Sequence, residues 1–251
     1  MNTVFSETDS RLRLPVRMYK NGTWRDTTDL VTKELPYAIS WSHEGCDGSC
    51  VLWAWPEAPA PLALGHVLLD QCPSPASLHR MAGVEQTGER AFHVTIGGAH
   101  TTPLPPPPEA CSPEKLFASM DAFIRAEGQW DDTGCFHRAG VLDPERGALL
   151  KRAEDIGRHN CIDRLAGWSV LEGTPLSDKI LLVSARMTSS LCAKALRAGF
   201  RILVSRSAVT SAAIDMAALE NATLVGFART DEQRFTVFAD PMGRLGAPLQ
   251  P

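Results

Sequence analysis

The second half of the chain alternates short, wholly apolar segments with segments whose apolar residues recur at helical spacing. Apolar runs at residues 180–183, 202–204, 223–227 and 235–238 are typical of strands, and the first is suited to burial on both faces of a sheet. Residues 188–198 and 211–220 have helical periodicity, and Gly199 is placed to end the first of these helices. Alternating strands and helices predict a three-layer α/β domain with a largely parallel sheet.

Residues 1–102 have a weaker pattern, which predicts a smaller α+β domain. Strands are expected at residues 13–19, 35–41, 51–55 and 91–96, with one apolar helix at residues 61–69. Four consecutive prolines at residues 105–108 then predict an extended connector over residues 103–111. Ser112, Pro113 and Glu114 have the order of a helix N-terminus, so the second domain is expected to cover residues 112–251.

One polar segment stands between a predicted strand at residues 147–153 and the helix that follows. Its sequence is Glu154-Asp155-Ile156-Gly157-Arg158-His159-Asn160-Cys161-Ile162-Asp163-Arg164. We expect the helix to begin near Asn160, with Asp163 answering Asn160 as in a capping box. Gly157 permits a tight turn that leaves Arg158 and His159 at the positive end of the helix, where an anion can bind. The alternative is a purely structural turn, in which Arg158 pairs with Glu154 or Asp155.

Two further loops have the same strand–loop–helix position, at residues 184–190 and 205–210. They offer arginines and small polar side chains, among them Ser184, Arg186, Thr188, Ser207 and Thr210. Ligands of open α/β sheets bind beside loops that leave the carboxyl ends of strands. Serine and threonine are also common helix caps, so any one loop could be structural. Three equivalent loops together favour a polyanionic ligand.

Composition and charge narrow the class of protein. The formal net charge of −4 argues against broad binding to nucleic acids or to anionic membrane surfaces. No apolar run approaches the roughly 20 residues that span a bilayer, and no signal peptide opens the chain. Seven cysteines are an odd and scattered set, which indicates reduced thiols rather than a disulfide framework. These features predict a soluble, cytoplasmic protein.

With these loops in view, the sequence resembles the FdhD/NarQ family of formate dehydrogenase accessory proteins. The family signature E-D-x-G-R-H-N-x-x-D-K matches residues 154–164, with Arg164 in place of lysine. The family segments T-G-x-x-H and S-A-x-T match residues 133–137, which end at His137, and residues 207–210. The segment S-x-R-x-S-x-E is matched by Ser184, Arg186 and Thr188, but Ser190 replaces its acid. The match is strong over residues 133–227 and faint before residue 103.

The resemblance implies a cytidine-deaminase-like domain that binds the molybdopterin guanine dinucleotide cofactor. It implies that sulfur from a cysteine desulfurase passes to this cofactor before insertion into the formate dehydrogenase catalytic subunit. The cofactor-binding residues expected from the matched segments are Gly157, Arg158, His159, Asn160, Asp163, His137, Ser184, Arg186, Thr188, Ser207 and Thr210. A guanine nucleotide should mimic the cofactor, and a homodimer is left open.

The chain departs from the family at its sulfur relay, which is a C-x-x-C pair on the loop between the domains. No C-x-x-C occurs in this sequence. Cys111, just before a predicted helix N-terminus, and Cys135, near His137, are the candidates for a relocated relay, although Cys135 is expected in a strand with poor access. We therefore predict an accessory protein that binds the cofactor and supports its sulfuration or delivery. The alternative is an active sulfurtransferase that uses Cys111 or Cys135.

A zinc enzyme is disfavoured by the cysteine spacing. A zinc deaminase would need Pro-Cys-x-x-Cys, which is absent. His43, Cys46 and Cys50 could begin a zinc site, with His66 or Cys72 completing it, but the C-x₃-C spacing is unusual and a second pair is absent. No metal is expected.

Overall fold

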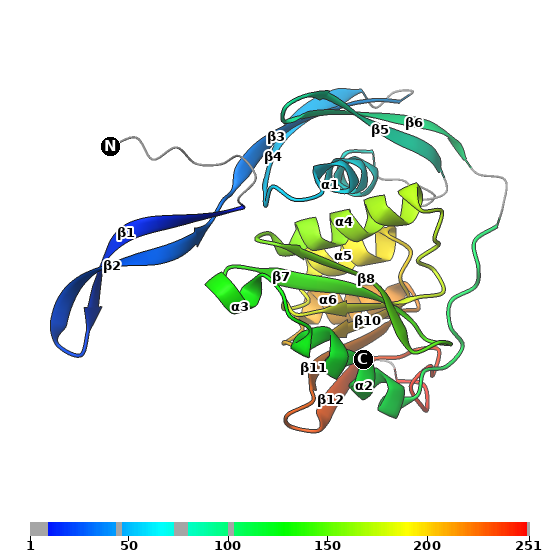
Figure 1. Cartoon of the computed structure of the whole chain (residues 1–251). Coiled ribbons are helices and arrows are strands. Elements are labelled where there is room, and N and C mark those ends of the chain that lie inside the picture. The colour runs from blue at the N-terminus through cyan, green and yellow to red at the C-terminus, as the bar shows by residue number, and fades with distance from the viewer. Residues whose placement is uncertain (1–9, 44–46, 73–79, 100–102, 250–251) are drawn as a thin grey trace.

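The computed structural model describes residues 10–43, 47–72, 80–99 and 103–249 of the 251-residue chain. Its strands and helices form three sheets and a set of helices that pack against two of them (Figure 1). None of the helices in these ranges is both long and apolar enough to cross a membrane.

The first two strands form a long antiparallel ribbon, which we call the arm. It consists of β1 (Arg11–Lys20) and β2 (Thr23–Thr32), paired along their whole length. Asn21 and Gly22 join them with φ angles of 52° and 80°, the left-handed pair that tight two-residue hairpins need. Only β1 was expected from the sequence. β2 is rich in Thr and Asp and lacks an apolar alternation, so its strand conformation comes from pairing with β1.

The second sheet has four strands in the order β4-β3-β6-β5. Their bounds are β3 (Leu35–Ser42), β4 (Gly48–Ala54), β5 (Arg80–Gly88) and β6 (Ala91–Ala99). One face packs on α1 (Pro59–His66), which continues as a short π-helix, η1 (Val67–Gln71). Strand β5 was not expected; its Ala82 and Val84 pack against this core, whereas Glu85, Gln86 and Thr87 are exposed.

Helix α1 also packs on α4 (Arg158–Leu171) at a very short distance. Two glycines allow the approach, because a Cβ added to Gly65 would lie 1.8 Å from the Asp163 carbonyl oxygen, and one added to Gly167 would lie 1.9 Å from that of Pro61. The two helix backbones therefore touch at two places, Gly65 against Asp163 and Gly167 against Pro61. The first part of the chain is therefore packed against the second, and a domain division at residues 103–111 remains a prediction.

The proline-rich connector is extended, as expected, and it is fixed to the body of the protein. The Ser177 hydroxyl donates to the Pro105 carbonyl at 2.7 Å, and Arg244 Nε donates to that of Pro108 at 3.1 Å. At its end the Cys111 N–H donates to the Arg244 carbonyl at 2.8 Å. The helix predicted next is α2 (Pro113–Arg125), and Ser112 caps it by accepting from the Lys115 N–H.

The third sheet has six strands in the order β12-β11-β10-β9-β7-β8. After the short α3 (Trp130–Thr133), its strands and helices are β7 (His137–Asp143), β8 (Ala148–Asp155), β9 (Ile180–Val183), α5 (Ser189–Arg197), β10 (Ile202–Ser205), α6 (Ser211–Leu219), β11 (Thr223–Arg229) and β12 (Arg234–Ala239). Helices α4, α5 and α6 cover one face and α2 covers the other, which confirms the three-layer α/β fold.

The expectation of a largely parallel sheet is wrong. Only two of the five strand pairs, β9–β10 and β10–β11, are parallel; the pairs β8–β7, β7–β9 and β11–β12 are antiparallel. The apolar runs of the sequence show burial on both faces, but antiparallel strands at the sides of a sheet can be equally apolar. The consequence is functional, because the beginning of β7 meets the carboxyl end of β9.

Candidate functional site

The three predicted loops converge at the edge of the six-stranded sheet where β9 and β10 end. The second and third loops contact each other through their backbones. The Met187 N–H donates to the Ala208 carbonyl at 2.9 Å, and the Thr210 N–H donates to the Met187 carbonyl at 3.1 Å. Because β7 is antiparallel to β9, His137 at the start of β7 lies at the same edge. Asp155 at the end of β8 pairs with His137, so the first loop begins beside His137, and His159 of that loop lies 3.1 Å from the hydroxyl of Ser190 in the second loop.

Three helices begin at this edge, and none of the three N-caps is a side-chain cap. The caps are Gly157 for α4, Thr188 for α5 and Thr210 for α6. A helix start without a side-chain cap leaves backbone N–H groups free for water or for an anion. The Thr188 hydroxyl instead contacts the Ser190 hydroxyl at 3.2 Å.

Three arginines in these loops form no ion pair with any carboxylate in the part of the chain that the structure describes. Within the described ranges, the side chains of Arg158, Arg186 and Arg206 make neither an ion pair nor a hydrogen bond. Arg158 Nε is buried and without a partner, whereas the other two side chains are exposed. Buried donors are normally satisfied, so an unpaired guanidinium nitrogen at such an edge favours an anionic ligand. Arg206 was left out of the sequence-based residue set, although its loop was recognised.

The surroundings of two histidines at the edge disfavour their protonated form and so lower their pKa values. Burial, with the charges of Arg158 and Arg186, lowers the pKa of His137 below its usual value. Burial also lowers the pKa of His159, together with the charges of Lys194 and Arg158. The His159 ring lies 3.1 Å from the Ser190 hydroxyl through Nε2. Both histidines can therefore act as neutral hydrogen-bonding groups beside a positive field.

A cavity of about 360 Å³ opens beside His137. Its walls come from α2, α3, the start of β7 and the loops after β9 and β10, namely Ile124, Trp130, Asp131, Phe136, His137, Arg138, Ser184 and Arg206. Two other cavities, of about 310 and 530 Å³, flank the connector and contain none of the predicted ligand-binding residues. Of these three cavities, the one beside His137 contains residues predicted to bind the ligand, His137 and Ser184.

Half of the central segment, however, turns into the protein interior. Asp155 is fully buried and accepts from Gly157 N–H, Asn160 Nδ2 and Arg164. The helix expected near Asn160 begins two residues earlier, at Arg158, with Gly157 as its N-cap, so the expected capping box of Asn160 and Asp163 does not form. Asn160 instead donates to the Trp53 carbonyl at 3.1 Å. Asn160 therefore ties α4 to the first part of the chain and does not face the ligand edge.

The structural alternative for Arg158 is also corrected, because its expected partners are engaged elsewhere. Glu154 binds Arg138 at 2.6 Å, and Asp155 binds Arg164 Nη2 at 2.6 Å. Arg164 further donates to the carbonyls of Trp55 and Ala58, both at 2.8 Å, and to that of Glu57. These contacts fix the approach of α1, and neither Glu154 nor Asp155 forms an ion pair with Arg158.

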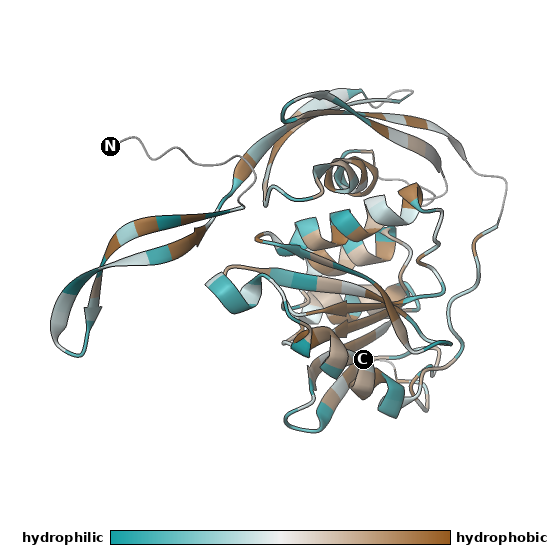
Figure 2. Ribbon diagram, viewed as in Figure 1, coloured by the Kyte–Doolittle hydropathy of each residue, from teal (hydrophilic) through white to brown (hydrophobic). Residues whose placement is uncertain are grey.

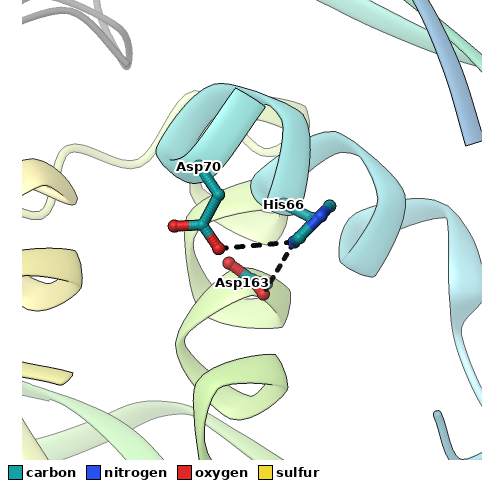
Figure 3. A group of neighbouring side chains, drawn as sticks. All are labelled: His66, Asp70 and Asp163. Carbon is teal, nitrogen blue, oxygen red and sulfur yellow. Dashed lines mark ion pairs between the residues drawn. The ribbon is translucent and has the colours of Figure 1, made fainter. Parts of the chain in front are cut away.

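Asp163 belongs to a separate charged cluster that bridges α1, η1, α4 and α5. His66 Nδ1 lies 3.5 Å from Asp70 and 3.6 Å from Asp163 (Figure 3). These three side chains resemble a metal-ligand set, but Lys194 Nζ lies 2.6 Å from Asp70 and 2.7 Å from Asp163. The buried ammonium group of Lys194 therefore occupies the position between Asp70 and Asp163 where a bound metal cation would have to lie. The cluster is therefore an ion-pair network, and Asp163 is not brought to the ligand edge.

The remaining predicted residues lie in the loops where the sequence placed them. The Ser184 hydroxyl accepts from the Arg138 N–H at 2.9 Å, which anchors its loop to the start of β7. The Ser207 N–H donates to the Ser205 hydroxyl at 3.0 Å, and the Ser207 carbonyl accepts from Phe227. Backbone contacts thus shape these loops, and Thr210 presents an exposed side chain beside them.

Comparison with known proteins identifies the family. The model of the FdhD/NarQ family matches residues 32–245. The chain belongs to the FdhD/NarQ family. It is 39% identical over 130 residues to the sulfur carrier protein FdhD of Bacillus subtilis, covering 52% of this chain and 48% of that protein. The sulfur carrier protein FdhD of Streptomyces avermitilis is 43% identical over 124 residues, covering 49% and 44%.

The chain spans about half the length of the curated relatives it matches. Its fold extends the likeness over nearly the whole chain. A solved structure from Desulfotalea psychrophila, named as a candidate formate dehydrogenase accessory protein, superposes with a TM-score of 0.78 at 21% identity. The match covers 94% of this chain and all of that one.

Three cysteines differ from what the sequence led us to expect in their exposure, pKa or bonding. Cys135 is exposed and precedes β7, so the expectation that it lies in a strand with poor access is wrong. Cys111 is half-buried, and burial raises its pKa despite the nearby charge of Lys115, which corrects the expected thiolate. Cys72 is disulfide-bonded, an exception to the expected free thiols.

In the zinc cluster considered from the sequence, Cys46 lies outside the described residues, and burial raises the pKa of Cys50. The absence of zinc remains a prediction.

Proposed function

We propose that this chain binds the guanine dinucleotide form of the molybdopterin cofactor at the edge formed by its three loops. In this proposal it acts in the cytoplasm and supports sulfuration or delivery of the cofactor to the formate dehydrogenase catalytic subunit. This role in formate dehydrogenase maturation is supported by relatives named as sulfur carrier proteins and by a similar solved structure named as a formate dehydrogenase accessory protein. The observation that supports an anionic ligand is that the guanidinium groups of Arg158, Arg186 and Arg206 have no partner among the residues that the structure describes.

The physical argument is one of charge and geometry. A pyrophosphate needs several donors that are not already neutralised, and open helix starts with arginines supply them. Neutral His137 and Ser184 add polar contacts in the adjoining cavity. The pterin and nucleoside parts of a dinucleotide need room on both sides of the pyrophosphate. A cavity flanked by loops from several strands offers this room.

Calorimetric titration with guanosine diphosphate tests the ligand class. Replacing Arg158 by alanine removes a charge-assisted contact and should weaken binding by about 1.5–3 kcal/mol. Arg146→Ala is the matched control, because this exposed arginine lies at the opposite end of β7. Equal affinity for wild type and Arg158→Ala would remove the first loop from the site. No binding by the wild-type protein would contradict the proposal itself.

A second candidate function is active sulfur transfer through Cys135, favoured by the exposure of this thiol close to His137. The Cys135 thiolate would attack the outer sulfur of a desulfurase persulfide, forming a Cys135 persulfide and releasing the desulfurase thiolate. Intact-mass analysis after incubation with a cysteine desulfurase and cysteine tests this step. A reducible adduct of one sulfur that is lost in Cys135→Ser but kept in Cys111→Ser would support transfer. If the wild-type protein forms no adduct, sulfur transfer through Cys135 is contradicted, and cofactor binding remains the proposed role.

A further inference from the structure

The cavity beside His137 has walls of two chemically different kinds. The loops after β9 and β10 contribute Ser184 and Arg206, which belong to the proposed anion site. The facing wall comes from α2 and α3, and in it Trp130 and Asp131 stand side by side at the start of α3. Figure 2 shows α3 as a hydrophilic turn at the rim of the molecule. Neither residue belongs to the matched family segments, the nearest of which covers residues 133–137.

Asp131 presents a fixed and partly unpaired carboxylate to this cavity. Its Oδ2 accepts from the Gly128 N–H at 3.0 Å and from Arg138 Nη2 at 3.1 Å. Arg138 is buried and also donates to Glu154 at 2.6 Å and to the Ile124 carbonyl at 2.8 Å, so the carboxylate rests on a rigid support. Oδ1 makes no hydrogen bond with any described residue, and the side chain is 59% exposed.

This carboxylate is ionised at neutral pH. The hydrogen bond from Gly128, and then the hydrogen bond and charge of Arg138, outweigh desolvation and lower the pKa of Asp131. An ionised carboxylate can only accept hydrogen bonds, and each of its oxygens has two lone pairs. Asp131 Oδ1 can therefore accept two hydrogen bonds from a ligand in the cavity.

Trp130 supplies an aromatic surface next to this acceptor. It lines the cavity and is 51% exposed. Planar heterocycles stack on exposed indole rings, because every such ring has an apolar face. The cavity volume of about 360 Å³ is at the lower end of the range for small-ligand pockets, which suits a single ring system.

The charges around the cavity narrow the class of ring. The Asp131 carboxylate repels phosphate oxygens, and the guanidinium group of Arg206 across the cavity disfavours a cation. A neutral planar ring with two adjacent N–H donors satisfies both conditions. The 2-amino-4-oxopyrimidine ring has this donor edge, and both guanine and pterin contain it.

We propose that Trp130 and Asp131 form a recognition site for a 2-amino-4-oxopyrimidine ring, which stacks on the indole while its two adjacent N–H groups donate to the Asp131 carboxylate. The inference rests on the proposed function, because a phosphate of the same ligand would bind the arginines of the loops. It adds a rule of selection. Guanine offers both donors, hypoxanthine lacks the amino group and offers one, and adenine places an unprotonated ring nitrogen against the carboxylate.

Calorimetric titration of the full chain with three nucleoside diphosphates tests this rule. Wild type should bind guanosine diphosphate about 10-fold or more tightly than adenosine diphosphate, with inosine diphosphate between them. Asp131→Asn should lose this preference, because an amide can donate to adenine as well as accept from guanine. Asp132→Asn is the matched control and should keep the preference, since Asp132 pairs with Arg11 at 2.6 Å and does not line the cavity. A structural role of Asp131 alone would change all three affinities together.

Replacing the indole tests the stacking surface. Trp130→Ala should weaken guanosine diphosphate binding by about 10-fold, and Trp130→Phe should restore most of the loss. Trp24→Ala, which removes an exposed indole from the arm, should have no effect. Inorganic pyrophosphate should bind all of these variants as it binds wild type, which shows that the anion site is intact.

Neopterin, which has the same donor edge and no phosphate, distinguishes the two sources of the ring. Neopterin binding that is lost in Asp131→Asn would identify pterin as the ring bound here, whereas a guanine preference without neopterin binding would identify guanine. Equal affinity for guanosine and adenosine diphosphates with no neopterin binding would overturn the inference and leave a phosphate site that pyrophosphate still detects. A ring preference that persists in Asp131→Asn would overturn it as well. A wild-type protein that binds none of these ligands would contradict the proposed function too.

Discussion

Arg158 and Arg164 lie six residues apart in one helix, and the protein uses their identical side chains for different tasks. Arg164 is 6% exposed and has a partner for each guanidinium nitrogen, whereas Arg158 has none among the described residues. The sequence predicted an anion site at Arg158 but grouped Asn160 and Asp163 with it. It could not separate them, because the inward turn of these side chains depends on how closely α1 approaches α4.

The first prediction concerns Arg164, where the family signature has lysine. Arg164→Lys should lower the free energy of unfolding by about 1–3 kcal/mol, since one ammonium cannot bind Asp155 and also satisfy the carbonyls of Trp55 and Ala58. Urea unfolding followed by fluorescence measures the change. Arg158→Lys is the matched control and should leave the unfolding free energy nearly unaltered. An equally stable Arg164→Lys protein would mean that the carbonyls find other donors.

At the scale of elements, the second half of the fold was predictable and the first half only in part. The strands at residues 180–183, 202–205 and 223–229 follow apolar runs, because both of their faces are covered by helices. Strands β2 and β5 have polar, exposed positions and take their conformation from a neighbouring strand. The direction of each strand also could not be predicted from the sequence. It matters for the site, because β7 runs antiparallel to β9 and so brings His137 to the ligand edge.

The second prediction concerns the contact between α1 and α4. Gly167→Ala places a methyl group against the Pro61 carbonyl, 1.9 Å away before relaxation, and neither backbone can yield without separating the helices. The thermal midpoint should fall by several degrees, as expected for a loss of about 2 kcal/mol or more from overpacking. Gly83→Ala is the control, because nothing lies within 4 Å of the added methyl group. A Gly167→Ala protein as stable as Gly83→Ala would contradict the close crossing.

At the scale of the whole molecule, the ion-pair network around Lys194 joins the first part of the chain to the second. Asp70 comes from η1, Asp163 from α4, and Lys194 from α5. Burial alone would raise the pKa of Asp70, but the hydrogen bond and charge of Lys194, with the charges of His66 and Arg197, outweigh it. The pKa of Asp70 therefore lies below its usual value.

The third prediction is the pH dependence of this link. A carboxyl whose pKa is lower in the folded than in the unfolded state stabilises the fold above about pH 4, and this stabilisation is lost as the pH falls through the folded pKa. Asp70→Asn should therefore be less stable than wild type at pH 7, with the difference shrinking below about pH 4. Denaturant titrations at several pH values measure it. Asp26→Asn, at an exposed pair in the arm, is the control and should show no such trend. A constant difference at all pH values would exclude Asp70 as the source.

The close crossing of α1 and α4 has a consequence for the covalent continuity of the chain. Residues 103–111 are the only peptide link between the two packed parts, yet the glycine contact, Arg164 and Lys194 hold those parts together without it. A single proteolytic nick in the connector should therefore leave a complex of two fragments that migrates as one species under native conditions and separates in denaturant. The same halves, produced from two genes in one cell, should find each other and assemble as a split protein.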